Sequence, residues 1–220
     1  MWDWNGTLLG DTAVTVASAR SGLAAIGIVS LVDVDLWRKI ATRPLSETYV
    51  RLAGRDLTPE EWLTVIQVWD TAYRSTVSRA SLNDGVLEAL TTARDAGLTQ
   101  SIVSLNVVDE VRLRAARLGI APYFTDIVGS RPGDWGLTSQ PTKADLLRSH
   151  AATRRLDPAD VLVIGDMTDD ADAAEQAGMR SVLVPVGDTS KERLIASGHR
   201  VVDTLPQAVA LATTPGPVRE

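Results

Sequence analysis

The sequence contains no cysteine and only two histidines, His150 and His199. Without cysteine the chain forms no disulfide, binds no metal through thiolate and offers no cysteine nucleophile. Two histidines are too few for a zinc centre built from several imidazoles, so any metal would be held by oxygen atoms. That donor set favours Mg²⁺ over zinc. We expect both histidines to lie on the surface.

Basic clusters and long apolar runs are also absent. The net charge is −6 and no run is rich in Lys or Arg, which argues against nucleic acid as the main partner. There is no apolar stretch of about 18 residues and no basic segment that leads into an apolar core. We therefore expect a cytoplasmic protein without a membrane partner. The 220 residues are 45% hydrophobic and 23% charged, as in a globular protein with a substantial core.

From residue 81 onwards, short apolar segments alternate with helical ones. Such alternation predicts a parallel sheet with right-handed crossovers. The stretch 130–140 is rich in glycine and proline and is expected to be a loop, and 213–220 is expected to be a frayed tail. We predict strands over 101–105, 124–128, 161–164 and 181–186, and helices over 86–96, 107–118, 168–177 and 189–197, with one more beginning at 142.

The stretch between Asp11 and Arg79 shows helical spacing throughout and no clear strand. Thr58-Pro59-Glu60-Glu61 is a strong helix start, because it places a capping hydroxyl, a proline and two acids in the first turn. The sequence thus predicts an α/β protein with a Rossmann-like parallel sheet core. The core covers 1–11 and 81–220, and an all-helical insertion over 12–80 interrupts it after the first strand.

The first strand is expected to end at Asp3, within Trp2-Asp3-Trp4-Asn5-Gly6-Thr7-Leu8. Asn-Gly predicts a tight turn that exposes the Asp3 carboxylate and several backbone N–H groups at the edge of the sheet. The same dipeptide also marks ordinary hairpins. A strand of usual length has about five residues, whereas two precede Asp3. Either this strand is short or the natural start lies upstream.

Chemically capable residues follow the predicted strands: Asp3 the first, Ser104 the second, and Asp166 the stretch 161–164, while Lys143 opens a helix. In a parallel sheet these positions converge at one edge. A carboxylate can attack phosphorus as a nucleophile, and two carboxylates can hold Mg²⁺. The Ser104 hydroxyl and the backbone amides after it, beginning with Leu105, can bind phosphate oxygens. A lysine offsets further negative charge.

Taken in order, these residues resemble the four motifs of the haloacid dehalogenase superfamily. Asp3-Trp4-Asn5-Gly6-Thr7-Leu8 resembles the first motif, an aspartate–x–aspartate–Gly–Thr–Leu loop. Ser104 resembles the Ser/Thr of the second motif and Lys143 the lysine of the third. Gly165-Asp166-Met167-Thr168-Asp169-Asp170 resembles the fourth, a Gly-Asp with an acid four residues after the Asp. The helical insertion matches the C1 cap of the phosphoglycolate-phosphatase-like group.

The resemblance implies a Mg²⁺-dependent phosphatase of small, phosphoglycolate-like monoesters that forms an aspartyl-phosphate on Asp3. It implies that Mg²⁺ is held by Asp3, the backbone carbonyl of Asn5 and Asp166. Asp170 would bind the metal through water or would orient Asp166 and Lys143. Asp169 is the alternative residue for this role, but it is expected to face solvent. The implied partner is a small phosphorylated metabolite, and the protein is expected to be a monomer or homodimer. Phosphate would be bound by Gly6, Thr7, Ser104, Leu105 and Lys143.

Asn5 departs from the family pattern, which has an aspartate there as general acid and base. An amide performs neither role, and such help is worth about 10²–10⁴ in rate. Three interpretations remain open: a slow enzyme or one suited to good leaving groups, a different acid, or deamidation of Asn5-Gly6. Dehalogenation and phosphonate cleavage are alternatives within the superfamily. A catalytically weak protein that binds a phosphorylated ligand or a protein partner is the alternative from another class.

The insertion and the first motif also offer substrate contacts. Arg43 and Arg51 can pair with a carboxylate or a second phosphate, and Arg43, beside Pro44, is the better candidate. Both can equally be surface arginines. Trp4, adjacent to the expected nucleophile, either shapes the pocket or joins the core.

Overall fold

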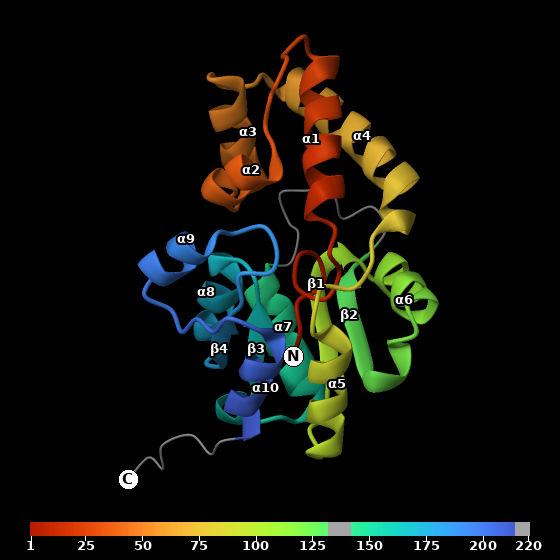
Figure 1. The fold of residues 1–220 in the computed structure, drawn as a ribbon, viewed down its shortest axis with the longest axis vertical. Helices are drawn as coiled ribbons and strands as arrows, with labels where there is room; N and C mark the ends of the chain where they lie inside the picture. The colour runs from red at the N-terminus through yellow and green to blue at the C-terminus, as the bar shows by residue number, and fades with distance from the viewer. Residues whose placement is uncertain (132–141, 214–220) are drawn as a thin grey trace.

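The structure is a computed structural model that describes residues 1–131 and 142–213 (Figure 1). The glycine- and proline-rich stretch over 132–140 and the tail after residue 213 lie outside these ranges, so the predictions made for them are not addressed. The helices α1 to α4 lie together at one end of the molecule, and the sheet with the later helices lies at the other.

Parallel pairing joins the strands on both sides of the chain's first residues. Trp2 bridges Ile102 on one side and Ile164 on the other, so the segment around it lies at the centre of the sheet. The order is therefore β2, β1, the Trp2 segment, β3, β4, with Val201 pairing with Leu183 of β4. The predicted α/β class is confirmed. The strands are β1 Ser101–Val107, β2 Asp126–Ser130, β3 Leu162–Gly165 and β4 Arg180–Leu183.

The expected first strand consists of little more than Trp2. Its N–H donates to the Ser101 carbonyl and its carbonyl accepts from the Val103 N–H, both at 2.9 Å. The Asp3 N–H donates to the Ile164 carbonyl at 2.9 Å. A short segment is sufficient here because neighbouring strands bind it on both sides, and it delivers Asp3 to the carboxyl edge.

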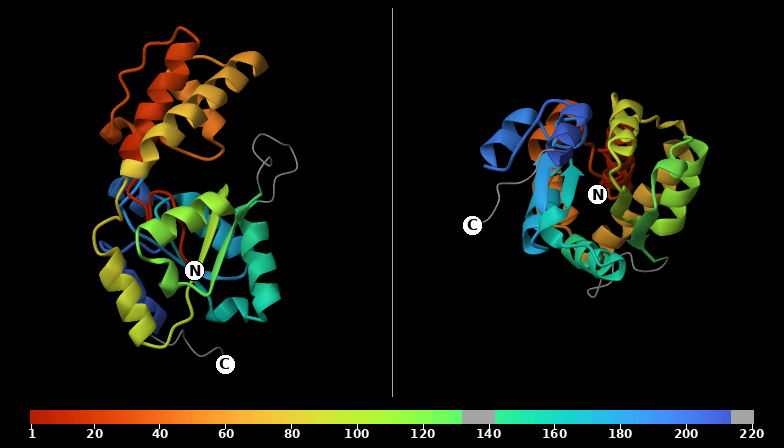
Figure 2. Two further views of the ribbon diagram at one scale, coloured as in Figure 1. Left: turned by 90° about the vertical axis from the view of Figure 1, so that its right-hand side faces the viewer. Right: turned by 90° about the horizontal axis from the view of Figure 1, so that it is seen from below.

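The helices of the α/β part cover both faces of the sheet (Figure 2). Alternation along the strands explains this arrangement, because successive side chains point to opposite faces. Ile102 and Ile164 join a core with α5, α6 and α10, whereas Val103 and Val163 join a core with α7 and α8. None of the described helices is both long and apolar enough to cross a bilayer. The helices are α5 Val86–Asp95, α6 Val108–Arg117, α7 Lys143–Arg154, α8 Thr168–Gln176, α9 Lys191–Ala196 and α10 Leu205–Thr213.

The helical part has a core of its own, built around Val16, Leu23, Trp37, Tyr49 and Val65. Its last helix begins with the expected capping box, in which the Thr58 hydroxyl and the Glu61 carboxylate each accept from the other's backbone N–H. The limits drawn from the sequence, 12–80 for this part, stay a prediction. The helices are α1 Thr12–Ala25, α2 Val34–Ile40, α3 Leu45–Ala53 and α4 Pro59–Thr76, followed by a 3₁₀ turn over Val77–Arg79.

The expectation that both histidines lie on the surface is wrong for His150. Its side chain faces inward from α7 and the residue is only 5% exposed. His199 is partly exposed, and its Nε2 lies 2.9 Å from an Asp172 carboxylate oxygen. The sequence around His150 is mostly polar, so nothing in its local pattern distinguished the inner face of α7 from the outer one.

Candidate active site

A pocket lies between the helical part and the carboxyl edge of the sheet, with a cavity volume of about 90 Å³. The lining from the sheet side contains most of the residues proposed from the sequence. The helical part contributes aromatic and charged side chains from α2, α4 and the start of α3. The lining includes Asp3, Asn5, Ser104, Leu105, Asn106, Lys143, Asp169, Asp170 and Asp188 from the sheet side, and Trp37, Arg43, Leu45, Trp69, Asp70, Tyr73 and Arg74 from the helical side.

Asp3, Asp166 and Asp170 form a buried carboxylate cluster. One oxygen from each lies within 4.8 Å of the others, and the residues are 8%, 0% and 3% exposed. Lys143 forms ion pairs with Asp3 and Asp170. Asp170 also accepts from the backbone N–H groups of Asp166 and Met167, at 3.2 and 3.1 Å. Residues far apart in the chain are thus brought together as the strand-end rule predicted.

Burial dominates the electrostatics of this cluster. It raises the pKa of Asp3 to about 7, with Lys143 acting in the opposite direction and Asp170 adding to the rise. It also raises the pKa of Asp166 well above its usual range, and the nearby Asp188 and Asp170 charges add to the effect. Burial alone would lower the pKa of Lys143, but the Asp170 and Asp3 carboxylates raise it overall. The cluster therefore lacks positive charge.

The donor set fits a divalent cation that prefers oxygen ligands. Within the described part of the chain, Lys143 pairs with two of the three carboxylates, Asp3 and Asp170, while Asp166 accepts hydrogen bonds from Thr7 and the Asp188 N–H. Buried carboxylates are costly unless cations or hydrogen bonds compensate them. Oxygen-rich clusters of this size and charge are typical of Mg²⁺ or Ca²⁺ sites rather than zinc sites. Asp3, Asp166 and Asp170 are thus the residues that can hold a metal here.

The turn after Asp3 is shaped by Gly6, which has a φ of +78°. A Cβ at this position would lie 2.5 Å from an Asp166 carboxylate oxygen, so only glycine fits without rearrangement. The Gly6 N–H donates to Asp11 at 2.9 Å, and the Thr7 hydroxyl donates to Asp166 at 2.8 Å. Neither residue lines the pocket. These two donors therefore hold the loop and Asp166 in place, and phosphate binding by Gly6 and Thr7 stays a prediction.

Ser104 and Leu105 line the pocket, as expected, but they lie within β1, which continues to Val107, rather than at its end. The regular pairing of β1 with β2 stops just before them, at Val103. Ser104 is 2% exposed and its hydroxyl accepts from the Asn106 N–H at 3.0 Å. That bond leaves the hydroxyl hydrogen available as a donor towards the pocket. Asn106, which sequence reasoning missed, also lines the pocket.

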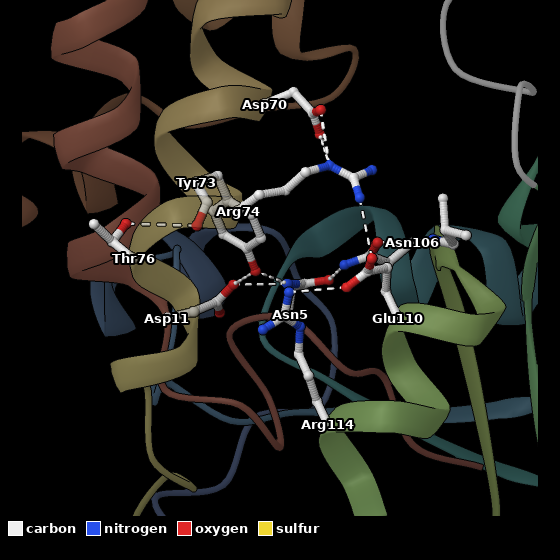
Figure 3. A network of polar contacts seen from close by, with 10 residues as sticks. Asn5, Asp11, Asp70, Tyr73, Arg74, Thr76, Asn106, Glu110 and Arg114 are labelled. Carbon is white, nitrogen blue, oxygen red and sulfur yellow. Dashed lines mark hydrogen bonds and ion pairs between the residues drawn. The ribbon is translucent and has the colours of Figure 1, made fainter. Parts of the chain in front are cut away.

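The Asn5 amide is hydrogen-bonded at both its nitrogen and its oxygen (Figure 3). Its Nδ2 donates to Asp11 at 2.6 Å and to the Tyr73 hydroxyl at 2.8 Å. The Tyr73 hydroxyl donates to the same Asp11 oxygen at 2.5 Å. Asn106 Nδ2 donates to Asn5 Oδ1 at 3.1 Å. Burial raises the pKa of Asp11 to about 6, with Asp188 adding to the rise and these hydrogen bonds lowering it.

Sequence reasoning also missed Asp11, Tyr73 and Asp188. The Asp188 N–H donates to Asp166 at 2.6 Å, and its half-buried side chain lines the pocket. Asp188 follows the last predicted strand, so the strand-end rule that selected Asp166 applies to it as well. Asp11 looked like an ordinary helix-capping residue, and nothing local marks Tyr73, which is 62 residues away from Asp11 in the chain.

The remaining sequence candidates have different outcomes. Arg43 lines the pocket, and its charge faces Asp169 and Asp188. Arg51 is not in the lining and donates to the Ile40 carbonyl at 3.3 Å. Asp169 was expected to face solvent, but it is half-buried and lines the pocket. Of the two alternatives for Trp4, the structure supports the core: the side chain is fully buried there and is not in the pocket lining.

Known proteins resemble this chain over nearly its whole length. The sequence model of a family described as haloacid dehalogenase-like hydrolase matches residues 1–184. The tyrosine-protein kinase PtkA of Mycobacterium tuberculosis is 28% identical over 192 residues, which cover 85% of this chain. The chain spans only 62% of the length of PtkA. The phosphoglycolate phosphatase of Synechococcus elongatus is 26% identical over 197 residues, covering 90% of this chain and 88% of the relative.

Solved structures share the fold. A haloacid dehalogenase-like family protein from Streptococcus pneumoniae superposes with a TM-score of 0.79 at 20% identity, covering 97% of this chain and 96% of the other. Mycobacterium tuberculosis PtkA gives 0.77 at 24% identity, with 98% and 97% covered. At such identities the likeness extends to the arrangement of helices and strands and no further.

Proposed function

The chain belongs to the haloacid dehalogenase-like hydrolase family, and on that premise we propose that it is a Mg²⁺-dependent phosphatase of small phosphate monoesters. The observation that carries the proposal is the buried cluster of Asp3, Asp166 and Asp170 with Lys143 at the carboxyl edge. The names of its relatives, a phosphoglycolate phosphatase and a tyrosine-protein kinase, share phosphoryl transfer. The proposal includes a small phosphorylated metabolite as substrate, a cytoplasmic location and a monomeric or homodimeric state.

In the proposed reaction an Asp3 oxygen attacks phosphorus while the bond from phosphorus to the leaving oxygen breaks. The departing group takes the electron pair, and the phosphoryl group remains on Asp3 as an acyl phosphate. Water then attacks this phosphorus, which releases inorganic phosphate and restores the carboxylate. A Mg²⁺ held by Asp3, Asp166 and the Asn5 carbonyl, with Asp170 beside them, would supply positive charge to the phosphate oxygens.

The other residues have supporting roles in this proposal. The Ser104 hydroxyl and the backbone at Leu105 bind phosphate oxygens. The Lys143 ammonium, which contacts Asp3 and Asp170, stabilises the additional negative charge of the substrate and holds both carboxylates in place. The helical part covers the pocket and limits the access of water.

The deciding experiment is phosphate release from p-nitrophenyl phosphate and from phosphoglycolate, with and without Mg²⁺. We expect Mg²⁺-dependent turnover by the wild type and none by Asp3→Asn. Asp95→Asn is the matched control, because this exposed carboxylate lies outside the pocket lining. A peptide containing Asp3 should carry a phosphoryl group after acid quenching. Equal turnover by Asp3→Asn would contradict the proposed nucleophile.

Metal binding is measured separately from turnover. Mg²⁺ should raise the melting temperature of the wild type, because a ligand that binds the folded state alone stabilises it. Asp166→Asn should remove this response, whereas Asp95→Asn should retain it. A binding protein without activity is favoured by a specific residue, Asn5, which offers no acid or base. That alternative gains support if Mg²⁺ and phosphate raise the melting temperature while no ester is hydrolysed.

A further inference from the structure

Asn5 is held in the pocket as a neutral amide. One face of its side chain meets Asp11 and Tyr73, and its oxygen accepts from Asn106. The acceptors Asp11 and Tyr73 settle which end of the amide is Nδ2, and both its hydrogens have partners. An amide fixed in this way neither gives nor takes a proton during the reaction.

The neighbouring acids on the same side are engaged elsewhere. Asp11 is 2% exposed, does not line the pocket, and accepts hydrogen bonds on both oxygens. Glu110 forms ion pairs with Arg74 and Arg114, each at 3.0 Å. Asp70 pairs with Arg74 at 2.8 Å. The carboxylates of Glu110 and Asp70 are thus occupied by arginine side chains, and neither is positioned as a proton donor.

The leaving group departs towards the helical part. A displacement at phosphorus places the attacking and leaving oxygens roughly in line, so the leaving oxygen lies on the side away from Asp3. On that side α4 presents Trp69 and Tyr73, both in the pocket lining. Their rings stack at 4.7 Å with an interplanar angle of 11°. Figure 3 shows Tyr73 extending from α4 to Asn5. An aromatic wall formed by Trp69 and Tyr73 thus borders the leaving-group side.

We propose, building on the phosphatase function, that the substrates are phosphate esters of phenols rather than of alcohols. A phenol has a pKa of about 10, as in tyrosine, so it departs as a phenolate without a proton from the protein. An alcohol is several units less acidic, and its departure loses the factor of about 10²–10⁴ that a general acid supplies. The aromatic wall provides the surface on which a planar leaving group packs.

The transfer of the phosphoryl group to Asp3 needs no reactant besides the ester and water. Asp3 forms the new bond to phosphorus, the bond to the phenolic oxygen breaks, and the phenolate takes the electron pair and later a proton from water. Asn5 also gives no base for the water that attacks the acyl phosphate. We therefore expect hydrolysis of the acyl phosphate to be slower than release of phenolate. The first turnover should then appear as a burst of one phenolate per active site.

The test compares phenyl phosphate with benzyl phosphate, which share a ring but differ in the acidity of the leaving group. For the wild-type protein with Mg²⁺ we expect kcat/KM to be at least about 100-fold higher for phenyl phosphate. A series of ring-substituted phenyl phosphates should show kcat/KM rising with phenol acidity. A ratio near unity would overturn the inference and indicate an acid on the opposite wall, such as Asp169 or Asp188. Absence of turnover of p-nitrophenyl phosphate would instead contradict the proposed phosphatase function, and this inference would fail with it.

The role of the aromatic wall is tested with acetyl phosphate, which has a good leaving group and no ring. Trp69→Leu should lower kcat/KM for phenyl phosphate about 5-fold more than for acetyl phosphate. Trp69→Phe should restore most of the difference, because it keeps an aromatic ring at the position. An equal decrease for both substrates in Trp69→Leu, with no recovery in Trp69→Phe, would contradict recognition of a phenolic group.

Discussion

At the scale of single residues, Asn5 is matched to Asp11. The amide donates to the carboxylate at 2.6 Å, and Gly6 and Tyr73 supply further donors to the same carboxylate. An aspartate at position 5 would place a second carboxylate against the buried Asp11. The asparagine, which departs from the family motif, thus matches the hydrogen-bonding needs of its neighbours.

We predict that Asn5→Asp lowers the free energy of unfolding by about 1–3 kcal/mol, because a buried donor is lost and a like charge takes its place. The pair Asn5→Asp with Asp11→Asn should recover at least half of that loss, since the donor and acceptor merely exchange places. Urea unfolding of the two single variants and the double variant gives the coupling energy. Additive losses would show that the two residues do not interact in this way.

We predict that deamidation of Asn5-Gly6 is slow in the folded protein. Ring closure requires the Gly6 nitrogen to attack the Asn5 side chain, but the Gly6 N–H donates to Asp11 and the amide has three hydrogen-bond partners. Peptide mass mapping after prolonged incubation should find Asn5 intact in folded wild type and converted in urea. Conversion at the same rate in both states would show that the hydrogen bonds do not protect it.

At the scale of elements, α4 connects the helical part to the sheet through two adjacent residues. Tyr73 reaches the buried Asp11, whereas Arg74 pairs with Glu110 of α6 at the pocket rim. The side chains of Arg74 and Glu110 are 49% and 30% exposed. Ion pairs in such surroundings contribute little, while a buried hydrogen bond to a carboxylate contributes more. The buried contact should therefore dominate.

Tyr73→Phe is accordingly expected to lower the free energy of unfolding by about 1.5–3 kcal/mol, because Asp11 loses a donor. Arg74→Gln, the matched change at the next position, should cost less than about 1 kcal/mol. Urea unfolding measures both values, and hydrogen exchange at the end of α4 should increase in Tyr73→Phe alone. Equal losses of unfolding free energy in the two variants would show that the buried Tyr73 contact does not dominate.

The elements themselves were largely predictable from the sequence. Strand and helix positions depend on local apolar spacing and on caps such as Thr58, which act within a few residues. A helix at α10 was not predicted, and the sequence left open whether the first strand is short. Trp2 forms strand bonds only because β1 and β3 lie on either side of it. The helix α10 buries Leu205, Ala208 and Val209 in the core shared with α5.

At the scale of the whole molecule, His150 is expected to make the free energy of unfolding depend on pH. Burial lowers its pKa below the usual 6.5, with Asp126 acting in the opposite direction. The unfolded chain then binds more protons than the folded one just below pH 6.5. The stability is complete above pH 6.5 and decreases as the pH falls towards the lower, folded pKa.

For the wild type we predict a decrease of less than about 1.4 kcal/mol per pH unit from this residue, the slope for one whole proton. His150→Leu should show a weaker pH dependence, because it has no titrating group in the same buried place. Urea midpoints at pH 8 and pH 5.5 for both proteins provide the comparison. Identical slopes would mean that His150 does not contribute.

The sequence by itself determined the α/β class, the restriction of any metal site to oxygen donors, and the convergence of Asp3, Ser104 and Asp166 at the carboxyl edge of the sheet. It did so because these depend on composition, on local spacing and on the rule that parallel strands end at one edge. The motif resemblance extended this to a family, through residues that lie in order along the chain.

The tertiary structure alone decided what each side chain meets. It placed Trp4 in the core, committed Gly6 and Thr7 to internal hydrogen bonds, and turned His150 inward. It also brought Tyr73 of α4 onto Asp11, across 62 residues. Contacts of this kind depend on how separate elements pack in space, and no periodicity within one segment encodes the face that a distant segment will cover.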